Sequence, residues 1–171
     1  MGSTQSPFDE WIELKNMTSD EVDLSGWPIT RIENTGAETL MLVLPVGASI
    51  PANGFYLISN YSDSSDSSAL NVAPNYIDTS VSLSNLLLQI KIYDESSNLA
   101  NLIDIAGDGG LPLTGAHGIN KESMARKSNS NDGALISDWF SDSTHNSKTY
   151  WDDKEYNSEG NNFGTPGGPN V

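Results

Sequence analysis

Short stretches of alternating apolar and polar residues recur along the first two thirds of the chain. In residues 10–14 the side chains of Ile12 and Leu14 share one face, and polar residues alternate with them. This period of two is typical of a β-strand with one buried face. Turn-forming residues follow at 16–21, and residues 22–27 then predict a second short strand with a glycine at its bend.

Further short strands are predicted downstream. Residues 40–44 are continuously apolar, and residues 55–59 follow a turn that contains Pro, Asn and Gly. Residues 86–93 and 99–106, separated by a polar turn, predict a β-hairpin. No window sustains a helical apolar period, because Ser, Thr, Asn, Gly and β-formers interrupt each one. We therefore predict an all-β, immunoglobulin-like antiparallel sandwich.

The pattern also predicts particular positions. Pro28 has no N–H for a strand ladder, so its segment should lie at an edge, at a bulge or at the first position of a strand. Five large apolar residues should lie inside the sandwich: Ile12, Leu14, Trp27, Leu57 and Ile103.

The composition changes after about residue 107. We expect a core at about 8–107 and a long, irregular C-terminal arm at about 108–171, both within one domain of 171 residues. The arm is rich in Ser, Asn, Asp and Gly, and large aromatic residues are spaced along it. We expect these aromatics to pin the arm to the surface of the sandwich. They are Trp139, Phe140, Tyr150, Trp151, Tyr156 and Phe163.

Charge excludes some partners. Eight Lys and Arg stand against 23 Asp and Glu, a formal net charge of −15, which repels nucleic acid and anionic lipid. Divalent cations and basic protein surfaces stay permitted. The longest apolar runs are too short to cross a bilayer, so we expect no direct membrane insertion. The absence of Cys removes disulfides and thiolate chemistry, and the first six residues lack the features of a signal peptide.

Five sequence blocks, in this order, resemble the lamin tail domain family in its bacterial form. They span nearly the whole chain, and we expect the residues that carry the resemblance to be structural. The third block is the segment 52–58. The residues of the other four are Glu10, Trp11, Ile12, Glu13 and Leu14; Asp23, Leu24, Ser25, Gly26 and Trp27; Ser123, Met124 and Arg126; and Gly164, Thr165, Pro166, Gly167, Pro169 and Asn170.

The resemblance implies a compact immunoglobulin-like sandwich on an exported or cell-surface bacterial protein, often beside a hydrolase or nuclease domain. It implies a protein partner or a neighbouring domain, and no turnover. Physical reasoning accounts for the same residues, because Gly26 suits a corner that needs a positive φ and Trp27 is a large core filler.

One departure from the family pattern concerns the first strand. Bacterial members begin with an apolar strand that ends just before a turn resembling Met1-Gly2-Ser3. Without that strand, the edge beside residues 10–15 would be open. We expect the C-terminal arm, residues 3–8 or a strand from a second copy to cover it, and the last case would give a dimer.

Catalytic chemistry finds little support in the sequence. His117 and His145 lack a recognisable partner spacing, a nucleophile elbow or a zinc-binding pair. Glu10 and Glu13 lie on opposite faces of one strand, which does not suit two glycosidase carboxylates. We expect Glu13 to bond to a nearby side chain or backbone group, and we predict no catalytic site and no cofactor.

Two binding sites are weaker candidates. Asn129, Asn131 and Asp132 offer clustered oxygen ligands for calcium, although such runs are more often ordinary turns. Exposed aromatics at Tyr150-Trp151 and Tyr156 would suit a sugar, and the competing interpretation is that they pin the arm. The leading hypothesis is a structural or interaction module. The second is a ligand-binding module for surface glycans or calcium-dependent partners, and the third is a hydrolase.

Overall fold

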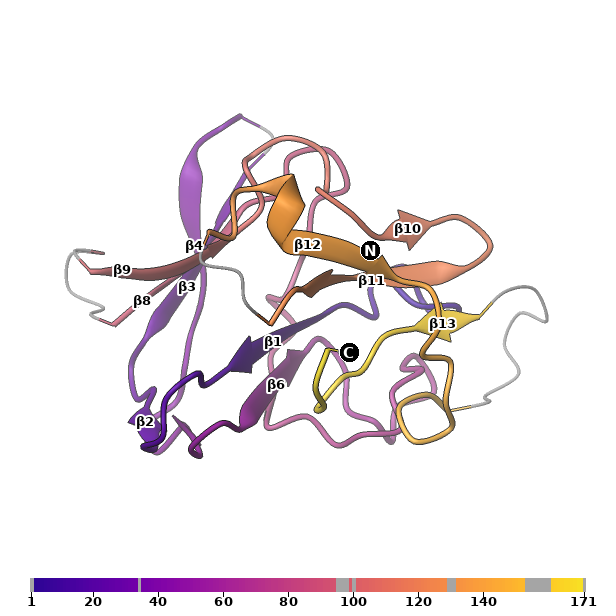
Figure 1. The fold of residues 1–171 in the computed structure, drawn as a ribbon, viewed down its shortest axis with the longest axis horizontal. Coiled ribbons are helices and arrows are strands. Elements are labelled where there is room, and N and C mark those ends of the chain that lie inside the picture. The colour runs from indigo at the N-terminus through magenta and orange to yellow at the C-terminus, as the bar shows by residue number, and fades with distance from the viewer. Residues whose placement is uncertain are drawn as a thin grey trace.

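The computed structural model describes residues 2–33, 35–94, 99, 101–128, 132–152 and 161–170. Its regular elements are strands, apart from one short 3-10 helix (Figure 1). They are β1 (Trp11–Lys15), β2 (Val22–Asp23), β3 (Pro28–Ile32), β4 (Glu38–Val43), β5 (Ser49–Ile50), β6 (Phe55–Ser59), β7 (Tyr76–Ile77), β8 (Ile90–Tyr93), β9 (Leu102–Ala106), β10 (Ala116–His117), β11 (Lys121–Arg126), η1 (Ile136–Asp138), β12 (Trp139–Asp142) and β13 (Asn162–Phe163).

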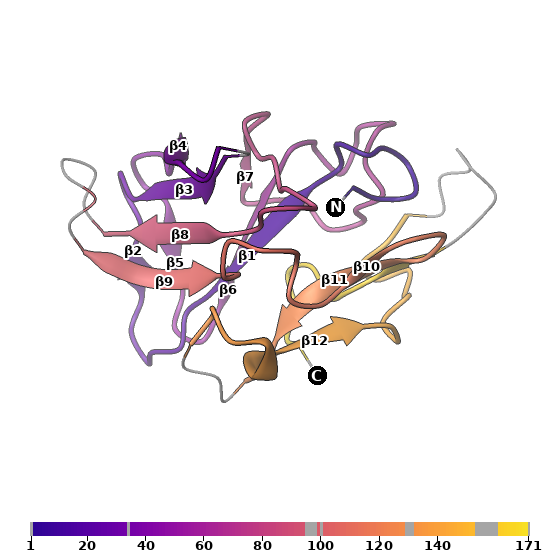
Figure 2. The same ribbon diagram turned by 90° about the horizontal axis from the view of Figure 1, so that it is seen from above.

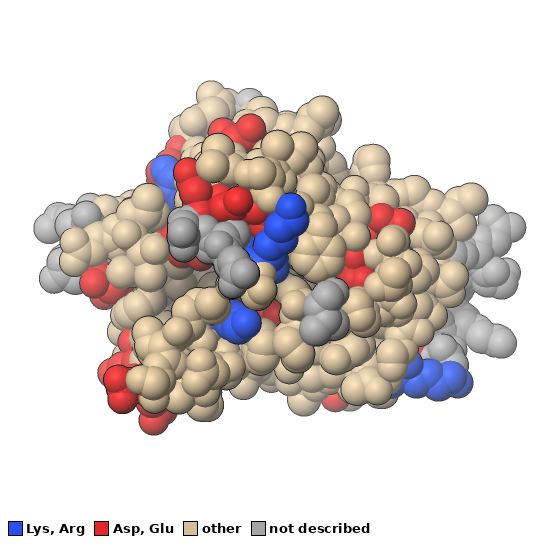
Figure 3. Space-filling model, in the orientation of Figure 1, with Lys and Arg blue, Asp and Glu red and all other residues tan. Residues whose placement is uncertain are grey.

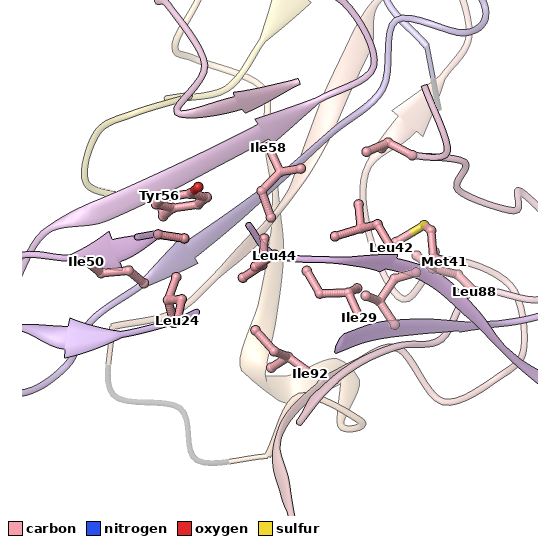
Figure 4. Packing of buried hydrophobic residues seen from close by; sticks show 13 residues of the cluster. Leu24, Ile29, Met41, Leu42, Leu44, Ile50, Tyr56, Ile58, Leu88 and Ile92 are labelled. Carbon is pink, nitrogen blue, oxygen red and sulfur yellow. The ribbon is translucent and has the colours of Figure 1, made fainter. Parts of the chain in front are cut away.

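The first nine strands form the predicted sandwich. One sheet has the order β4-β3-β8-β9, and facing it lie the sheet β1-β6-β7 and the pair β2-β5. Figure 4 shows side chains from both layers meeting in one hydrophobic cluster, with Ile29 and Ile92 from the first layer and Ile58 from the second. Ile29 and Ile58 are both fully buried. The predicted all-β, immunoglobulin-like class is confirmed.

The alternation in β1 works as predicted. Ile12 and Leu14 pack against the main cluster, and Trp11 packs on the other face against a smaller cluster that contains Trp151. β1 pairs antiparallel with β6 in a regular register that places Ile12 opposite Ile58.

The predicted hairpin exists, but its first strand is shorter than expected. β8 begins at Ile90 and pairs antiparallel with β9, whereas Leu86 precedes the strand and is largely exposed. The apolar run 40–44 also divides, because Leu40 points to solvent while Leu42 and Leu44 are buried. Leu40 and Leu42 are two positions apart, so alternation alone does not explain this division. The pairing of β3 with β4 shifts register between them, from Ile29–Leu42 to Thr30–Leu40, and this bulge interrupts the alternation.

The corner after β2 has the predicted geometry. The backbone N–H of Ser25 donates to the Asp23 carboxylate at 2.8 Å, and Gly26 has a φ of +77°. This Asx turn and the left-handed glycine reverse the chain tightly. Pro28 then occupies the first position of β3, which is one of the places that its missing N–H allowed.

The C-terminal arm is more ordered than expected. β10, β11 and β12 form a small antiparallel sheet, β13 pairs parallel with β11, and Figure 2 shows this sheet beside the sandwich. Trp139 and Trp151 are buried, as expected of aromatics that pin the arm. Tyr156 lies outside the described residues.

The predicted interior needs one correction. Leu57 is buried as expected, and Ile12, Leu14 and Trp27 are half-buried residues packed against the core. Ile103, however, is 50 % exposed, so its placement inside was wrong. The period of two correctly identifies a strand there, but it carries no information on whether another element covers that face.

Candidate functional site

A groove of about 550 Å³ opens on one side of the sandwich, between β1, β9 and β11. Its floor includes Leu24, Ile29 and Ile92, which belong to the main hydrophobic cluster. Leu24 and Ile29 are at most 1 % exposed, so the groove ends against a closed, close-packed core. Ile103 lines the groove too, which is the physical reason for its exposure.

One wall of the groove is the outer edge of β1. The N–H of Asn60 donates to the carbonyl of Glu10 at 2.9 Å, and the N–H of Asn16 donates to the carbonyl of Gly54 at 3.0 Å. In an antiparallel ladder these bonds show that the backbone N–H and C=O groups of the even-numbered residues of β1 point towards β6. The backbone groups of the odd-numbered residues 11, 13 and 15 thus point away from β6. Within the described part of the chain they have no backbone partner.

The opposite wall, at β9, is partly closed. The N–H of Gly107 donates to the carbonyl of Gly133 at 2.9 Å, and the N–H of Ile105 donates to the adjacent Asp104 carboxylate at 2.8 Å. Asp104 is also paired with Arg126 of β11. The unpaired edge of the groove is therefore mainly that of β1.

Glu13 joins β1 to the C-terminal arm. Its carboxylate accepts a hydrogen bond from the N–H of Gly167, as expected of a group bonded to nearby backbone. Burial raises the pKa of Glu13 to about 7, against the backbone donors of Gly167 and Gly168, which lower it. The arm thus contacts the side chain of β1 without pairing with its backbone edge. The expected cover by a strand of the arm or by residues 3–8 is absent among the described residues.

Some of the family-motif residues make contacts near this groove. Arg126 pairs with Asp104 and lies over the Trp139 ring, 5.7 Å from its centroid. The Asn170 side chain donates to the carbonyl of Arg126 at 3.2 Å, which ties the closing motif to β11. Glu10 accepts a hydrogen bond from the N–H of Leu83 at 2.9 Å. Sequence reasoning missed the Asp104–Arg126 pair, because residues 22 positions apart carry no local signal.

The two histidines do not form a recognisable catalytic group. His145 Nδ1 lies 2.8 Å from the buried carboxylate of Asp142 and 3.2 Å from the Thr144 hydroxyl. All these contacts use one ring nitrogen, and no described hydroxyl is hydrogen-bonded to the other. A Ser-His-Asp constellation needs the nucleophile on that second nitrogen. His117 is an exposed residue of β10.

The candidate calcium ligands are only partly visible. Asn129 and Asn131 lie outside the described residues. Asp132 accepts a hydrogen bond from the N–H of Ala134 at 2.9 Å, as in an ordinary turn. Within the described ranges, no three His, Cys, Asp or Glu side chains gather as a metal site would require.

In the candidate sugar platform Trp151 is buried, Tyr150 is half-buried, and Tyr156 lies outside the described residues. Trp151 is 7 % exposed, its ring tilts against Trp11 with centroids 6.4 Å apart, and its Nε1–H donates to the carbonyl of His145 at 3.1 Å. A buried ring cannot offer its face to a sugar. The interpretation that this aromatic pins the arm therefore fits the geometry.

The comparisons with known proteins agree with the fold. Residues 1–111 match the model of the Lamin Tail Domain family, so the chain belongs to the lamin tail domain family. The match covers β1 to β9 and stops before β10. No curated protein and no solved structure matches the chain. Among the described residues, no helix has the length and apolar character needed to span a membrane.

Proposed function

We propose that the chain is a non-catalytic interaction module that binds a partner protein or positions a neighbouring domain. The observation that carries this proposal is the groove, which borders the core of the sandwich beside a strand edge that has no backbone partner among the described residues. Concave apolar surfaces of this kind are typical of binding sites. Membership of a family of immunoglobulin-like, non-enzymatic domains supports the same conclusion.

The location on an exported or cell-surface bacterial protein is part of the proposal. It rests on the resemblance of the five sequence blocks to bacterial family members. The net charge of −15 supports contact with proteins in preference to nucleic acid, because the field of the whole molecule repels phosphate.

The absence of turnover can be tested directly. Purified protein should not hydrolyse phosphodiesters or glycosides above the background of a mock purification. A variant with His117→Ala and His145→Ala should behave identically. Hydrolysis that copurifies with the chain and is lost in the double variant would contradict the proposal. Glu38→Gln is a suitable control, because it removes a carboxylate far from both histidines in the sequence.

A calcium-dependent interaction remains the second candidate function, resting on the run of oxygen-bearing side chains that includes Asp132. We expect a chelator to leave the melting temperature unchanged within about 1 °C, since the run lacks the terminal bidentate Glu of the best-known calcium loop. A fall of several degrees that Asp132→Ala abolishes would favour calcium binding.

A further inference from the structure

The closing motif, residues 164–170, follows the last strand and runs back to β1. β13 ends at Phe163, and no residue of the motif belongs to a strand. Thr165 is nevertheless 2 % exposed, and Pro166 is fully buried. Figure 1 shows this yellow end of the chain crossing from β13 towards β1 and β6. The motif is thus a buried segment that discrete contacts hold in place, without a strand ladder.

Four residues of the motif form a tight turn that meets Glu13. The N–H of Gly168 donates to the carbonyl of Thr165 at 2.9 Å, and Gly167 has a φ of +77°. With Pro166 at the second position, these are the features of a type II turn. The N–H of Gly167 points out of the turn and donates to the Glu13 carboxylate. Glu13 is therefore the contact of β1 with the turn.

The two glycines allow the turn to lie close to apolar neighbours. A Cβ on Gly167 would lie 2.9 Å from Cγ1 of Val72, and a Cβ on Gly168 would lie 3.0 Å from the Tyr150 hydroxyl. Val72, Tyr150 and Trp11 all pack against the smaller hydrophobic cluster. The turn therefore covers an apolar surface, and its release would expose that surface to water.

The contact with the turn places the charge of Glu13 in an unfavourable environment. The closing motif contains no titratable side chain. Figure 3 shows uncharged residues, in tan, over most of the region to which this end of the chain runs in Figure 1. Burial raises the pKa of Glu13 to about 7, although the N–H groups of Gly167 and Gly168 and the charge of Lys15 lower it. The backbone donors thus replace only part of the lost hydration of the carboxylate.

Other titratable groups lie on the elements around Glu13. Arg126 is paired with Asp104, on the side of β9. The ammonium group of Lys15 lies over the Phe55 ring, 5.7 Å from its centroid. Among the described residues, Lys15 is the one whose charge acts on Glu13. The titratable side chains on these elements are Lys15 of β1, Tyr150 beside the turn, and Lys121, Glu122 and Arg126 of β11.

We propose that Glu13 is a pH-dependent latch that holds the closing motif against β1 in mild acid and releases it more readily at neutral pH. The latch belongs to the fold of the chain and does not depend on what the module binds. In the released state Glu13 is exposed to water and has its ordinary pKa of 4.5, whereas the docked state raises this pKa to about 7. The contribution of the protonated carboxylate to docking is therefore complete below pH 4.5 and is lost as the pH rises through about 7.

Amide exchange of Gly167, followed by NMR, measures this release. Its protection factor is the intrinsic exchange rate at each pH divided by the observed rate. This factor should fall at least about tenfold from pH 5 to pH 8, because docking favours the protonated carboxylate. Gly167 should also be less protected than the amides of β3 and β8 at every pH, since the motif opens locally. Protection that is independent of pH, or equal to that of β3 and β8, would overturn the proposal.

Two carboxylates at β1 provide a matched pair of variants. Glu13→Gln keeps an oxygen that accepts the N–H of Gly167 but does not titrate, so the protection of Gly167 should become independent of pH. Glu10 lies on the opposite face and accepts from the N–H of Leu83 at 2.9 Å. Glu10→Gln should therefore retain the pH dependence. An undiminished pH dependence in Glu13→Gln would overturn the assignment, and circular dichroism verifies that both variants are folded.

A third variant loosens the motif without touching the latch. The Asn170 side chain donates to the carbonyl of Arg126 at 3.2 Å. Asn170→Ala should lower the protection of Gly167 by a similar factor at pH 5 and at pH 8, so the ratio between the two values stays that of the unmodified protein. A ratio that fell to one would show that the pH dependence belongs to the Asn170 anchor, and the role of Glu13 as the latch would be wrong.

Discussion

The sandwich and the C-terminal sheet are stabilised in different ways. The main cluster of the sandwich contains 13 buried hydrophobic residues, whereas the smaller cluster beside the arm contains four, among them Trp151. Several polar side chains also tie the arm to the rest of the chain. Asn162 accepts from the N–H of Thr4 at 2.9 Å and donates to its hydroxyl at 2.7 Å. Strand alternation thus produces the sandwich, while isolated anchors hold the arm against it.

This difference predicts that the two regions respond differently to the loss of a large side chain. A residue in the continuous core is surrounded by apolar neighbours, so its removal affects the entire sandwich. An anchor of the arm can be lost while the sandwich stays folded.

The largest effect is expected for Ile29→Ala. Ile29 is fully buried in the centre of the main cluster, so truncation should leave a cavity and lower the free energy of unfolding by about 4 kcal/mol. Urea denaturation followed by circular dichroism measures this loss. Val46→Ala is the control, because Val46 is 94 % exposed and should change stability by less than about 0.5 kcal/mol. A similar effect of both variants would contradict the assigned core.

A somewhat smaller and local effect is expected for Trp151→Ala. The lost contacts with Trp11 and Leu70 should cost about 3 kcal/mol, the lower end of the range for buried aromatics, because the cluster is small. Amide exchange should accelerate in β11 to β13 and stay slow in β3 and β8. Uniform acceleration across both regions would show that the arm and the sandwich unfold as one unit.

Trp27→Ala should have a moderate effect. From the sequence, Trp27 is expected to be a core filler, but the structure shows a half-buried ring that lines the groove. Its truncation should therefore cost about 2 kcal/mol, less than for a fully buried aromatic. A loss above about 4 kcal/mol, measured by urea denaturation, would show that the ring is enclosed in solution.

The smallest effect concerns the link between the two regions, the contact of Glu13 with the arm. The folded-state pKa of about 7 exceeds the ordinary value of 4.5, so folding favours the protonated form. The contribution of Glu13 to stability is therefore complete below pH 4.5 and is lost as the pH rises through about 7. Glu13→Gln should flatten the decline in stability between pH 5 and pH 8.

Glu38→Gln is a control with the opposite sign. Burial raises the pKa of Glu38, but hydrogen bonds from Lys91, Tyr93 and Thr30 together lower it below 4.5. Its contribution is present above that value and is lost in acid. The denaturation midpoint of Glu38→Gln should differ in its pH dependence from that of the unmodified protein only below about pH 5.

If the midpoint of Glu13→Gln declined between pH 5 and pH 8 as steeply as that of the unmodified protein, the assigned role of Glu13 would be wrong.

Local sequence determined much of this fold. The period of two places Ile12 and Leu14 on the core face of β1, because alternate side chains of a strand must point to opposite sides. Turn chemistry determines the corner at Asp23 and Gly26, since these residues form it within a few positions of one another. The same reasoning predicted the β8–β9 hairpin, and the first position of β3 is one of the three places that it allowed for Pro28.

The groove and the order of the arm were decided only by tertiary structure. An alternating segment looks the same whether its neighbour is present or absent, so the exposure of Ile103 could not be read from its pattern. The strands of the arm are short and lack a strong alternating signal, and β13 pairs with β11 from far along the chain, which is why that region suggested an irregular course. The binding of Glu13 to Gly167 joins residues 154 positions apart. Such a contact depends on how the completed sheets pack, because no local rule links residues at that distance along the chain.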